Sequence, residues 1–423
     1  MAIKALRGTK DILPEEAPYF HMLEDTARRV FERYGYSEIR TPMFEATELF
    51  ARGIGEETDI VSKEMYTFED RKGRSLTLRP EGTAPAVRAM IEHGLLKQQG
   101  VQQKVYYLGP MFRYERPQAG RQRQFNTAGV EFFGCDSALA DAEVIAMLDT
   151  YLTELGFEKT TTKINTIGNA PSRQAYNAEL RRQCREFKDK LCGDCQRRSE
   201  VNPLRVLDCK VPTCQEIYAD FPLLSGFLDE ESRQHYALVK ETLDRLQIDY
   251  EEDPRLVRGF DYYSHTVFES RLEGLGAQDA AAGGGRYDGL VEQLGGPNTP
   301  AVGFGFGLER LILAMQAAGI QPPALSDERS GVYILALDDA GLLPATILAE
   351  KIRDAGHPAA FEFKARSIKA GFKAANREHF RYIAILGPEE LAENKATLKD
   401  LETGEETKRG FGEVVGALVE EGA

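Results

Sequence analysis

The sequence predicts an α+β protein: an antiparallel sheet flanked by helices, a helical insertion and a C-terminal α/β domain. Three observations favour this fold class. Runs rich in β-forming residues are separated by turns, a polar helical stretch with grouped cysteines interrupts them, and strands alternate with helices near the end. A length of 423 residues leaves room for two or three domains and a substrate cleft.

The first element is an expected amphipathic helix over residues 17–34, where Leu23, Ala27 and Val30 recur at helical spacing. The run YSEIRTP is expected to be a short strand stopped by Pro42. Five further β-rich runs are expected to build the core sheet: SLTLRP, KVYYLGPMFRYE, QFNTAGVEFFG, HTVFESRL and AVGFGFG. A helix over residues 141–155 is expected to pack against that sheet.

The order of these patterns predicts the domain organisation. A core domain over 1–169 is interrupted by a mostly helical, polar insertion over 170–250 and resumes over 251–325. The run PPALSDERSG, at 322–331, indicates a linker. After it, strand VYILAL, a helix, strand AAFEF, a helix and strand YIAIL predict a separate α/β domain over 326–423.

Composition narrows the class of protein. No stretch approaches the roughly 20 apolar residues of a membrane span, and the start MAIKALRGTK has no apolar leader, so we expect a cytoplasmic protein without a membrane partner. Six cysteines suit reduced thiols or a metal site better than a disulfide framework. A net charge of -14 argues against indiscriminate nucleic-acid binding, although a selective enzyme with local basic surface remains compatible.

The stretch FRYERPQAGRQRQF predicts a hairpin whose loop is Pro117 to Gly120. Side chains alternate between faces, so one face is expected to hold Arg113 and Glu115 from the first strand and Phe125, Thr127, Gly129 and Glu131 from the second. A guanidinium can fork onto a phosphate, an aromatic ring can stack on a base, and a carboxylate can accept N–H groups. The alternative is a solvated, salt-bridged hairpin without a ligand.

The run AVGFGFGLER places three glycines on one face of a strand and Phe304 and Phe306 on the other. A flat ligand can then approach the glycine face while the rings enter the core. Arg310 follows in the first turn of a helix, where an anionic ligand is a reasonable partner. A tightly packed strand is the alternative, since the run matches neither the dinucleotide nor the phosphate-loop fingerprint.

Together these stretches resemble class II aminoacyl-tRNA synthetases. The helix and strand ending at Pro42 resemble motif 1, FRYE through Phe125 motif 2, and GFGFGLER motif 3, while the class I patterns HIGH and KMSKS are absent. LVRGFDYYSHTVFE and AAGGGRYDGL resemble two stretches peculiar to histidyl-tRNA synthetases, and RGTKDILPEE and LRPEGTAPAVR look like the same family. Taken alone, GGGRYDG would be a turn and RGFDYY a strand entry with a structural ion pair.

The resemblance implies an enzyme that activates L-histidine with ATP, releases pyrophosphate and transfers histidine to tRNA-His. It implies Arg113 and Arg258 as catalytic residues on the α-phosphate, with Arg258 doing work that other class II enzymes give to a metal ion. Arg121 and Arg310 would hold the β,γ end of ATP with Mg²⁺. The ATP site implied by the resemblance consists of Arg113, Glu115, Arg121, Phe125 and Arg310.

The histidine site implied by the resemblance consists of Glu81, Gly82, Thr83, Arg113, Thr127, Glu131, Arg258, Tyr262 and Tyr263. Glu81 and Thr83 would receive the α-ammonium, and Glu131 and Tyr263 would bond the two imidazole nitrogens. Taken alone, Glu81 could instead cap a helix and the tyrosines could be core aromatics. The family commonly has Gln where this chain has Thr127, so a shorter side chain or a water must take that role.

Cys192, Cys195, Cys209 and Cys214 have spacings that could hold structural zinc. The chemistry of the resembled family needs no zinc, so no residue is assigned to a metal. Reduced thiols are the alternative.

Near the end of the chain a basic stripe is expected on one helix, from Arg366, Lys369, Lys373, Arg377 and Arg381. The resemblance implies that this last domain binds the tRNA anticodon arm and that the protein is a homodimer built on motif 1. A solvated helix face is the alternative for the stripe. A rival for the whole chain is the catalytically inactive, synthetase-like regulatory subunit of ATP phosphoribosyltransferase, which typically lacks the last domain and loses motif residues. A class II enzyme for another amino acid is a weaker rival.

Overall fold

The computed structural model describes residues 3–55, 58, 60–98, 100–117, 120–272, 280–325 and 328–420. Two expected features fall partly outside them: Gln118 and Ala119 of the hairpin loop, and residues 326 and 327 of the linker. The chain forms two compact units, Met1–Ala324 and Leu325–Ala423.

The helices of the larger unit are α1 (Ala17–Arg33), α2 (Thr47–Ile54), α3 (Thr83–Glu92), α4 (Ala138–Glu154), α5 (Ala170–Glu186), α6 (Gly193–Val201), α7 (Pro212–Ala219), α8 (Glu230–Arg245), α9 (Leu290–Gln293) and α10 (Leu308–Ala318). Its strands are β1 (Ser37–Glu38), β2 (Phe44–Ala46), β3 (Tyr66–Glu69), β4 (Ser75–Leu78), β5 (Gln103–Phe112), β6 (Gln124–Phe133), β7 (Thr161–Thr166), β8 (Tyr250–Glu252), β9 (Ser264–Arg271), β10 (Ala280–Arg286) and β11 (Ala301–Gly307).

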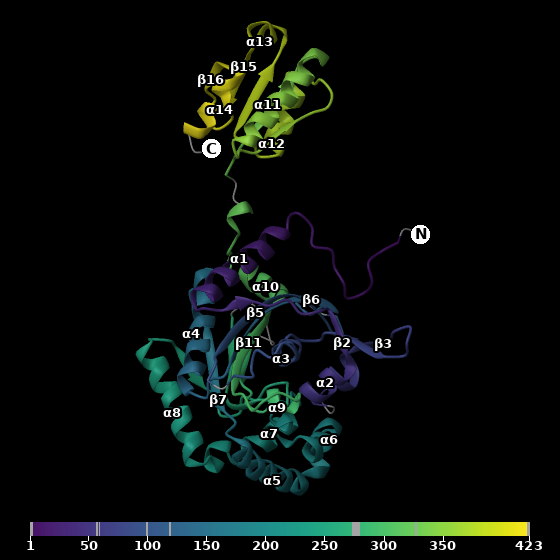
Figure 1. The fold of residues 1–423 in the computed structure, drawn as a ribbon, viewed down its shortest axis with the longest axis vertical. Helices are drawn as coiled ribbons and strands as arrows, with labels where there is room; N and C mark the ends of the chain where they lie inside the picture. Colours follow the sequence, from purple (N-terminus) through teal and green to yellow (C-terminus); the bar gives the residue numbers. More distant parts are fainter. Residues whose placement is uncertain are drawn as a thin grey trace. The chain divides into compact units, whose positions relative to one another are not determined.

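An eight-stranded sheet organises the larger unit, in the order β1-β5-β6-β11-β10-β9-β7-β8 (Figure 1). All pairs between β5 and β7 are antiparallel, and only the two edge pairs, β1 with β5 and β7 with β8, are parallel. The expectation of a largely antiparallel core sheet is confirmed.

Alternation along the strands gives this sheet an apolar face covered by α1, α4 and α10. Phe304 and Phe306 of β11 point into that layer, where Phe304 meets Phe31 of α1 and Phe306 stacks on Tyr151 of α4 at 4.8 Å. Because glycines 303, 305 and 307 alternate with these rings, β11 presents no side chain on its opposite face from Gly303 to Gly307. That opposite face is the floor of the site described below.

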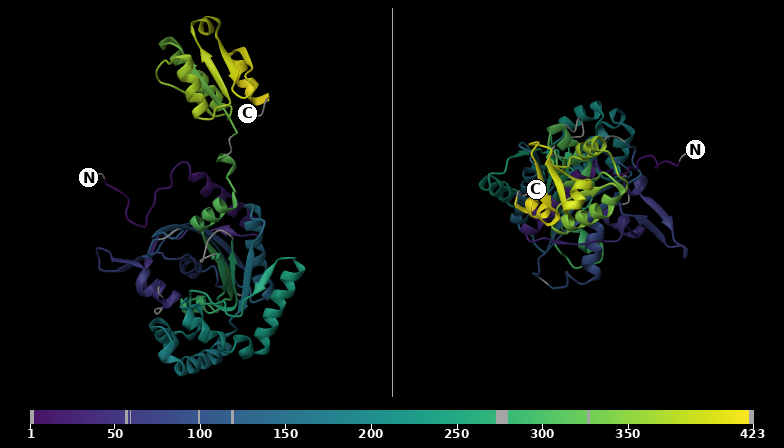
Figure 2. Two further views of the ribbon diagram at one scale, coloured as in Figure 1. Left: turned by 180° about the vertical axis from the view of Figure 1, so that it is seen from behind. Right: turned by 90° about the horizontal axis from the view of Figure 1, so that it is seen from above.

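One expectation for the sheet is wrong, and a second, the short strand in YSEIRTP, is correct except for where the strand ends. SLTLRP does not join the core sheet: β4 lies between β2 and β3 in a separate three-stranded sheet, which projects from the larger unit (Figure 2). The strand in YSEIRTP covers only Ser37–Glu38 and ends well before Pro42. Beyond that proline the chain forms β2, which pairs with β4 in the separate sheet.

The central strand β10 includes the GGGR part of GGGRYDG, so the alternative of a turn holds only for the end of the run, at Asp288 and Gly289. The strand runs through three glycines because its neighbours leave no room: a Cβ on Gly284 would lie 2.1 Å from the carbonyl oxygen of Gly303. It ends at Arg286, which is fully buried and pairs with Asp141 of α4. Close approach of backbones, rather than a reversal of the chain, explains these glycines.

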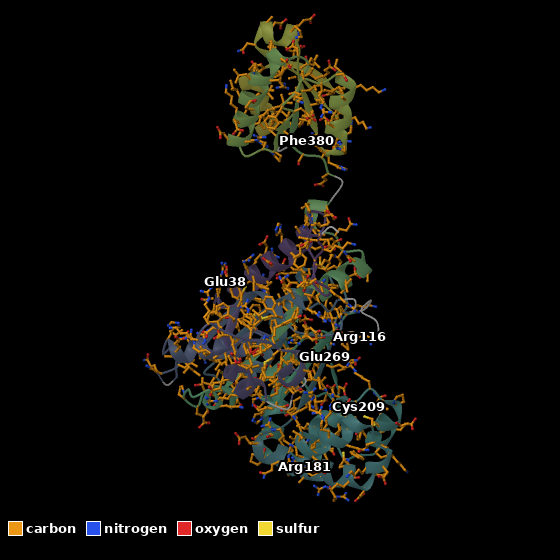
Figure 3. The ribbon with its side chains drawn as sticks, turned by 90° about the vertical axis from the view of Figure 1, so that its right-hand side faces the viewer. Glu38, Arg116, Arg181, Cys209, Glu269 and Phe380 are labelled. Carbon is orange, nitrogen blue, oxygen red and sulfur yellow. The ribbon has the colours of Figure 1, made fainter. Side chains whose placement is uncertain are left out.

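Helices α5 to α8 form the helical segment between β7 and β8, in which Figure 3 labels Arg181 and Cys209. The side chains of Asn169 and Asp229 accept backbone N–H groups at the starts of α5 and α8, as N-cap residues do. The helices between them are short, so packing and side-chain links must stabilise them.

The smaller unit is an α/β domain with a five-stranded sheet, in the order β13-β12-β14-β15-β16. Its elements are β12 (Val332–Ala336), α11 (Leu342–Asp354), β13 (Ala359–Phe361), α12 (Ile368–Arg377), β14 (Tyr382–Leu386), α13 (Pro388–Glu393), β15 (Lys395–Asp400), β16 (Glu406–Gly410) and α14 (Phe411–Glu420). The expected alternation from VYILAL to YIAIL is confirmed, and β15, β16, α13 and α14 extend it.

The basic stripe expected on one helix is only partly correct. Helix α12 carries Lys369, Lys373 and Arg377, but Ser367 caps its start, so Arg366 precedes the helix and pairs with Glu362. Arg381 follows the helix and lies near Asp400, at 3.5 Å. The helix surface therefore offers fewer free cations than the sequence spacing predicted. Among the described residues, no helix has both the length and the apolarity needed to cross a membrane.

Candidate active site

The site is built on the β5–β6 hairpin, which pairs Met111 with Phe125 and Tyr107 with Gly129. Strand β5 ends at Phe112, so Arg113 and Glu115 lie just beyond it and do not share a strand face as expected. The N–H of Arg113 still bonds the carbonyl of Arg123, which keeps the two arms together. Its guanidinium lies 3.7 Å from the Glu115 carboxylate.

Every residue that the sequence singled out for ATP or histidine lines one cavity of about 560 Å³. They come from segments more than 200 positions apart, between Glu81 and Arg310. The volume falls in the usual range for a small-molecule site, and the lining mixes aromatic rings with cations and carboxylates. The fold thus gathers these residues at one place on the glycine-rich face of the sheet.

Arg113 is held from several sides. Its Nε donates to the carbonyl of Pro80 at 2.8 Å, and its guanidinium lies over the rings of Phe125 (5.4 Å) and Phe260 (6.0 Å). Glu115 also accepts from Arg121 at 3.2 Å, so one carboxylate joins two guanidiniums. These contacts orient the cations before any ligand arrives, and a guanidinium carries several N–H groups with which it can bond anionic oxygens.

Arg258 also lines the cavity and forms an ion pair with Glu269 at 2.6 Å (Figure 3 labels Glu269). Its Nε is buried and has no hydrogen-bond partner among the described residues. Gly283 makes space for it, because a Cβ there would lie 2.2 Å from Nη2 of Arg258. A buried donor without a partner is costly, and an oxygen-rich ligand would satisfy it.

Glu131 lies at the bottom of the cavity and is 1% exposed. Its carboxylate accepts three hydroxyl groups: Thr83 at 2.7 Å, Tyr107 at 3.2 Å, and Tyr287. Burial raises the pKa of Glu131 to about 8, although the hydroxyls of Tyr287 and Thr83 act in the opposite direction. With no cation among these partners, the carboxylate is suited to accept an N–H from a ligand.

Glu81 caps α3, as the structural alternative predicted: its two oxygens accept the backbone N–H groups of Thr83 (2.5 Å) and Ala84 (2.9 Å). Burial raises its pKa, and these two N–H groups oppose that shift. A carboxylate has about four acceptor positions, so capping leaves capacity for a ligand cation. Gly82 has a spatial role as well, because a Cβ there would lie 2.2 Å from the ring of Tyr107.

The remaining expected residues frame this pocket. Tyr262 and Tyr263 are buried with their ring centroids 4.7 Å apart, and burial raises the pKa of both hydroxyls. Arg310 donates from Nε to the carbonyl of Ala280 at 2.9 Å, at the start of β10. Thr127 lines the cavity beside Gly305.

Sequence reasoning missed Tyr107, Tyr287 and Glu269. Tyr107 and Met111 lie on the same face of β5, and Met111 pairs with Phe125, which lines the cavity. Side-chain alternation along β5 could therefore have placed Tyr107 on the cavity face. Tyr287 lies inside the GGGRYDG run, whose turn interpretation concealed it. Glu269 sits in the HTVFESRL strand, and only its spatial pairing with Arg258 reveals its role.

The helical segment supplies one wall of the cavity through Arg205, Asp208 and Lys210. Asn202 donates to Asp261 at 2.6 Å, and Arg205 donates to the carbonyl of Gly259 at 2.9 Å. Both acceptors follow Arg258 closely in the chain. The segment therefore holds the loop that carries that arginine.

Comparison with known proteins adds independent evidence. The family description "Histidyl-tRNA synthetase" matches residues 8–185 and 215–311, and "Anticodon binding domain" matches 332–421. A histidine–tRNA ligase of Caldanaerobacter subterraneus subsp. tengcongensis is 48% identical over 99% of this chain and 100% of its own, and one of a Geobacillus strain is 47% identical over 99% of both. The crystal structure of apo Staphylococcus aureus histidyl-tRNA synthetase superposes with a TM-score of 0.82 at 38% identity, covering 98% of this chain and 99% of that one.

Proposed function

Since the chain belongs to the histidyl-tRNA synthetase family, we propose that its cavity binds ATP and L-histidine, forms histidyl-adenylate and transfers histidine to tRNA-His. The observation that carries the proposal is the meeting of two environments in one cavity. Arginines line the cavity, and so does a buried carboxylate that accepts hydrogen bonds from surrounding hydroxyl groups.

Arginine chemistry fits the activation step. Attack of the histidine carboxylate on the α-phosphorus forms a P–O bond, breaks the bond to the β-phosphate bridge and releases pyrophosphate. Negative charge shifts among phosphate oxygens, so preorganised cations lower the barrier. We assign the α-phosphate to Arg113 and Arg258, the β,γ end to Arg121 and Arg310, and the adenine to the ring of Phe125.

The lining of the cavity also includes residues suited to hold Mg²⁺. Glu115 and Glu309 provide lining carboxylates, and Mg²⁺ is usually held by one or two carboxylates together with substrate phosphates. The ion would neutralise charge on the phosphate oxygens. The protein's own contribution is to orient Arg121 through Glu115 and to hold Glu309 against the N–H groups of Asn126.

The pocket around Glu131 fits an imidazole. We propose that Glu131 accepts one imidazole N–H, that Tyr263 bonds the other nitrogen, and that Glu81 and Thr83 receive the α-ammonium. Thr127 leaves space that a water can fill. An amino acid without matching polar atoms would leave these buried groups unpaired, which supports discrimination of roughly 10⁴-fold or more.

The smaller unit is the proposed binding site of the anticodon arm, supported by its match to anticodon-binding domains and by the cations on α12. We also propose a homodimer. Met43, Phe44 and Phe68 on or beside the three-stranded sheet are each about half exposed, as expected of a surface that a second copy covers.

The regulatory-subunit alternative is disfavoured, because identity to histidine–tRNA ligases extends over the full chain and includes the last domain. The deciding experiment is charging of tRNA-His with labelled histidine by the full chain. Stable charging that requires ATP supports the proposal. Histidine binding without adenylate formation or charging would favour the regulatory function.

A further inference from the structure

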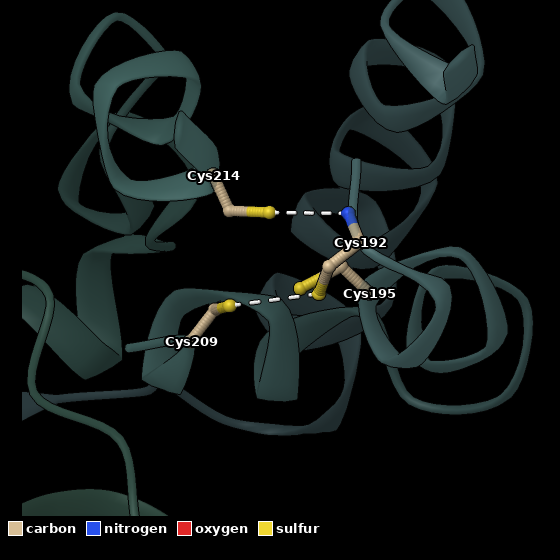
Figure 4. A group of neighbouring side chains, drawn as sticks. All are labelled: Cys192, Cys195, Cys209 and Cys214. Carbon is tan, nitrogen blue, oxygen red and sulfur yellow. Dashed lines mark hydrogen bonds between the residues drawn. The ribbon is translucent and has the colours of Figure 1, made fainter. Parts of the chain in front are cut away.

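We propose that Cys192, Cys195, Cys209 and Cys214 bind one Zn²⁺ ion and thereby fix the wall of the cavity that the helical segment supplies. Their four sulfur atoms all lie within 4.8 Å of one another, and three of the four residues are buried (Figure 4). The chain's six cysteines are all free thiols.

The sulfur spacing matches one tetrahedral ion. Zinc–thiolate bonds of about 2.3 Å place the corners of a tetrahedron about 3.8 Å apart. The Cys192 and Cys209 sulfurs are 3.8 Å apart, which is far longer than a disulfide bond. A multi-iron cluster would spread its ligands further, because additional iron and sulfide atoms lie between them.

Local structure favours thiolates at these positions. Cys192 occupies the N-cap position of α6 and Cys195 lies in its first turn, while Cys214 lies in the first turn of α7. Helix N-termini stabilise nearby negative charge through their unpaired backbone N–H groups. The backbone N–H of Cys192 also donates to the Cys214 sulfur at 3.3 Å, and that of Val211 donates to the Cys209 sulfur at 3.4 Å (Figure 4 draws the first). These donors offset the charge that four thiolates around a divalent ion retain.

The ion would join pieces that are individually weak. Helices α6 and α7 have nine and eight residues, lengths at which an isolated helix is marginal in water. Four thiolate ligands at or near the starts of α6 and α7 would hold the two helices together where the apolar contacts of such short helices are few, as in other small metal-stabilised folds. Binding exchanges up to four thiol protons for the ion, so affinity is expected to fall in acid.

The site also connects to the cavity. Asp208 and Lys210 flank Cys209 in the chain and line the cavity, and Asn202 and Arg205 hold the loop after Arg258. Fixing Cys209 therefore fixes the backbone that presents these side chains. The zinc would act on the reaction only through this positioning, because its four ligand positions are filled by protein.

The test is elemental analysis of the full chain, purified with a thiol reductant and without chelators. We expect close to one zinc per chain, and Co²⁺ exchange should give the intense thiolate-to-metal absorption of a tetrahedral site. Cys209→Ser should lose most of the zinc. Cys184→Ser, a buried cysteine of the same segment outside the group, should keep it.

A second readout does not depend on the variants folding well. Removing the metal from the wild-type chain should increase hydrogen exchange over residues 202–210, and added Zn²⁺ should restore protection. Three results would overturn the proposal: less than about a tenth of a zinc per chain with no Co²⁺ thiolate band, retention of zinc by Cys209→Ser, or exchange in 202–210 that ignores the metal.

Discussion

The most informative perturbation of the cavity is Glu131→Gln, because its effect should depend on pH in a calculable way. Loss of a charged acceptor costs about 1.5 to 3 kcal/mol, or roughly 10- to 150-fold in the dissociation constant for histidine. This full difference requires an ionised wild-type carboxyl. Since burial raises the pKa of Glu131 to about 8, the full difference in histidine affinity is expected only above that pH.

At pH 6 the wild-type carboxyl is mostly protonated, with only about one molecule in a hundred ionised. Ionising it to receive the imidazole then costs roughly 3 kcal/mol, because each pH unit below the pKa adds a little over 1 kcal/mol. This cost cancels most of the advantage over glutamine. The gap between wild type and variant should therefore be small at pH 6 and large at pH 9, and titration of free histidine cancels in the comparison.

Calorimetric titration of histidine and ATP at both pH values provides the assay. ATP affinity should be unchanged, because the hydrogen-bond partners of Glu131 are Thr83, Tyr107 and Tyr287, none of which we assign to ATP. Glu309→Gln, at a partly buried carboxyl of the same cavity, is the control and should retain histidine affinity. Equal weakening of both ligands by Glu131→Gln, or a gap independent of pH, would refute the reasoning.

The same pKa has a consequence for stability. A carboxyl whose pKa rises from 4.5 to about 8 on folding contributes stability that is fully present below pH 4.5 and lost as the pH rises through 8. The wild type should accordingly lose up to about 1.4 kcal/mol per pH unit relative to Glu131→Gln within that window. Urea unfolding of both proteins at pH 5.5 and 7.5 measures this, and parallel stability curves would contradict the raised pKa.

The other predictions concern Arg258 and the smaller unit. Arg258→Ala should slow ATP–pyrophosphate exchange roughly 10²-fold or more, and near-normal exchange would remove it from the catalytic residues. Gly283→Ala should slow exchange in the same direction by displacing that guanidinium, and the double variant should be no slower than Arg258→Ala alone; additive losses would separate the two positions. A chain ending at Leu325 should still make histidyl-adenylate but charge tRNA poorly with a flatter salt dependence, provided sedimentation shows the same oligomeric state. Undiminished charging would exclude residues 326–423 from anticodon binding.

Much of the fold could be predicted because the periodicity of apolar side chains indicates which segments form helices and which form strands. The helix near residue 20, the β5–β6 hairpin and the alternation of glycine with Phe304 and Phe306 are all present where the periodicity predicted them. The candidate site followed from the same periodicity and from family resemblance, since the face that bears Phe125 also bears Glu131.

Other features depend on contacts that no local pattern records. The sequence of β10 resembles a turn because it is rich in glycine. Those glycines are required by the close approach of the β11 backbone, which no local pattern in the sequence reveals. β4 lies outside the core sheet and pairs with β2, and nothing in the sequence of β4 alone indicates that partner. The hydroxyls around Glu131 and the Glu269 partner of Arg258 come from segments far apart in the chain, so only folding brings them together.

The central claim is that this cavity activates histidine with ATP, and its most direct test is ATP–pyrophosphate exchange measured with each of the twenty amino acids. The full chain should support exchange with histidine alone, and Arg258→Ala should abolish most of it. Exchange with a different amino acid would contradict the assignment of the pocket around Glu131. Absence of exchange with every amino acid, from protein that binds histidine, would contradict the assignment of the chain as an enzyme.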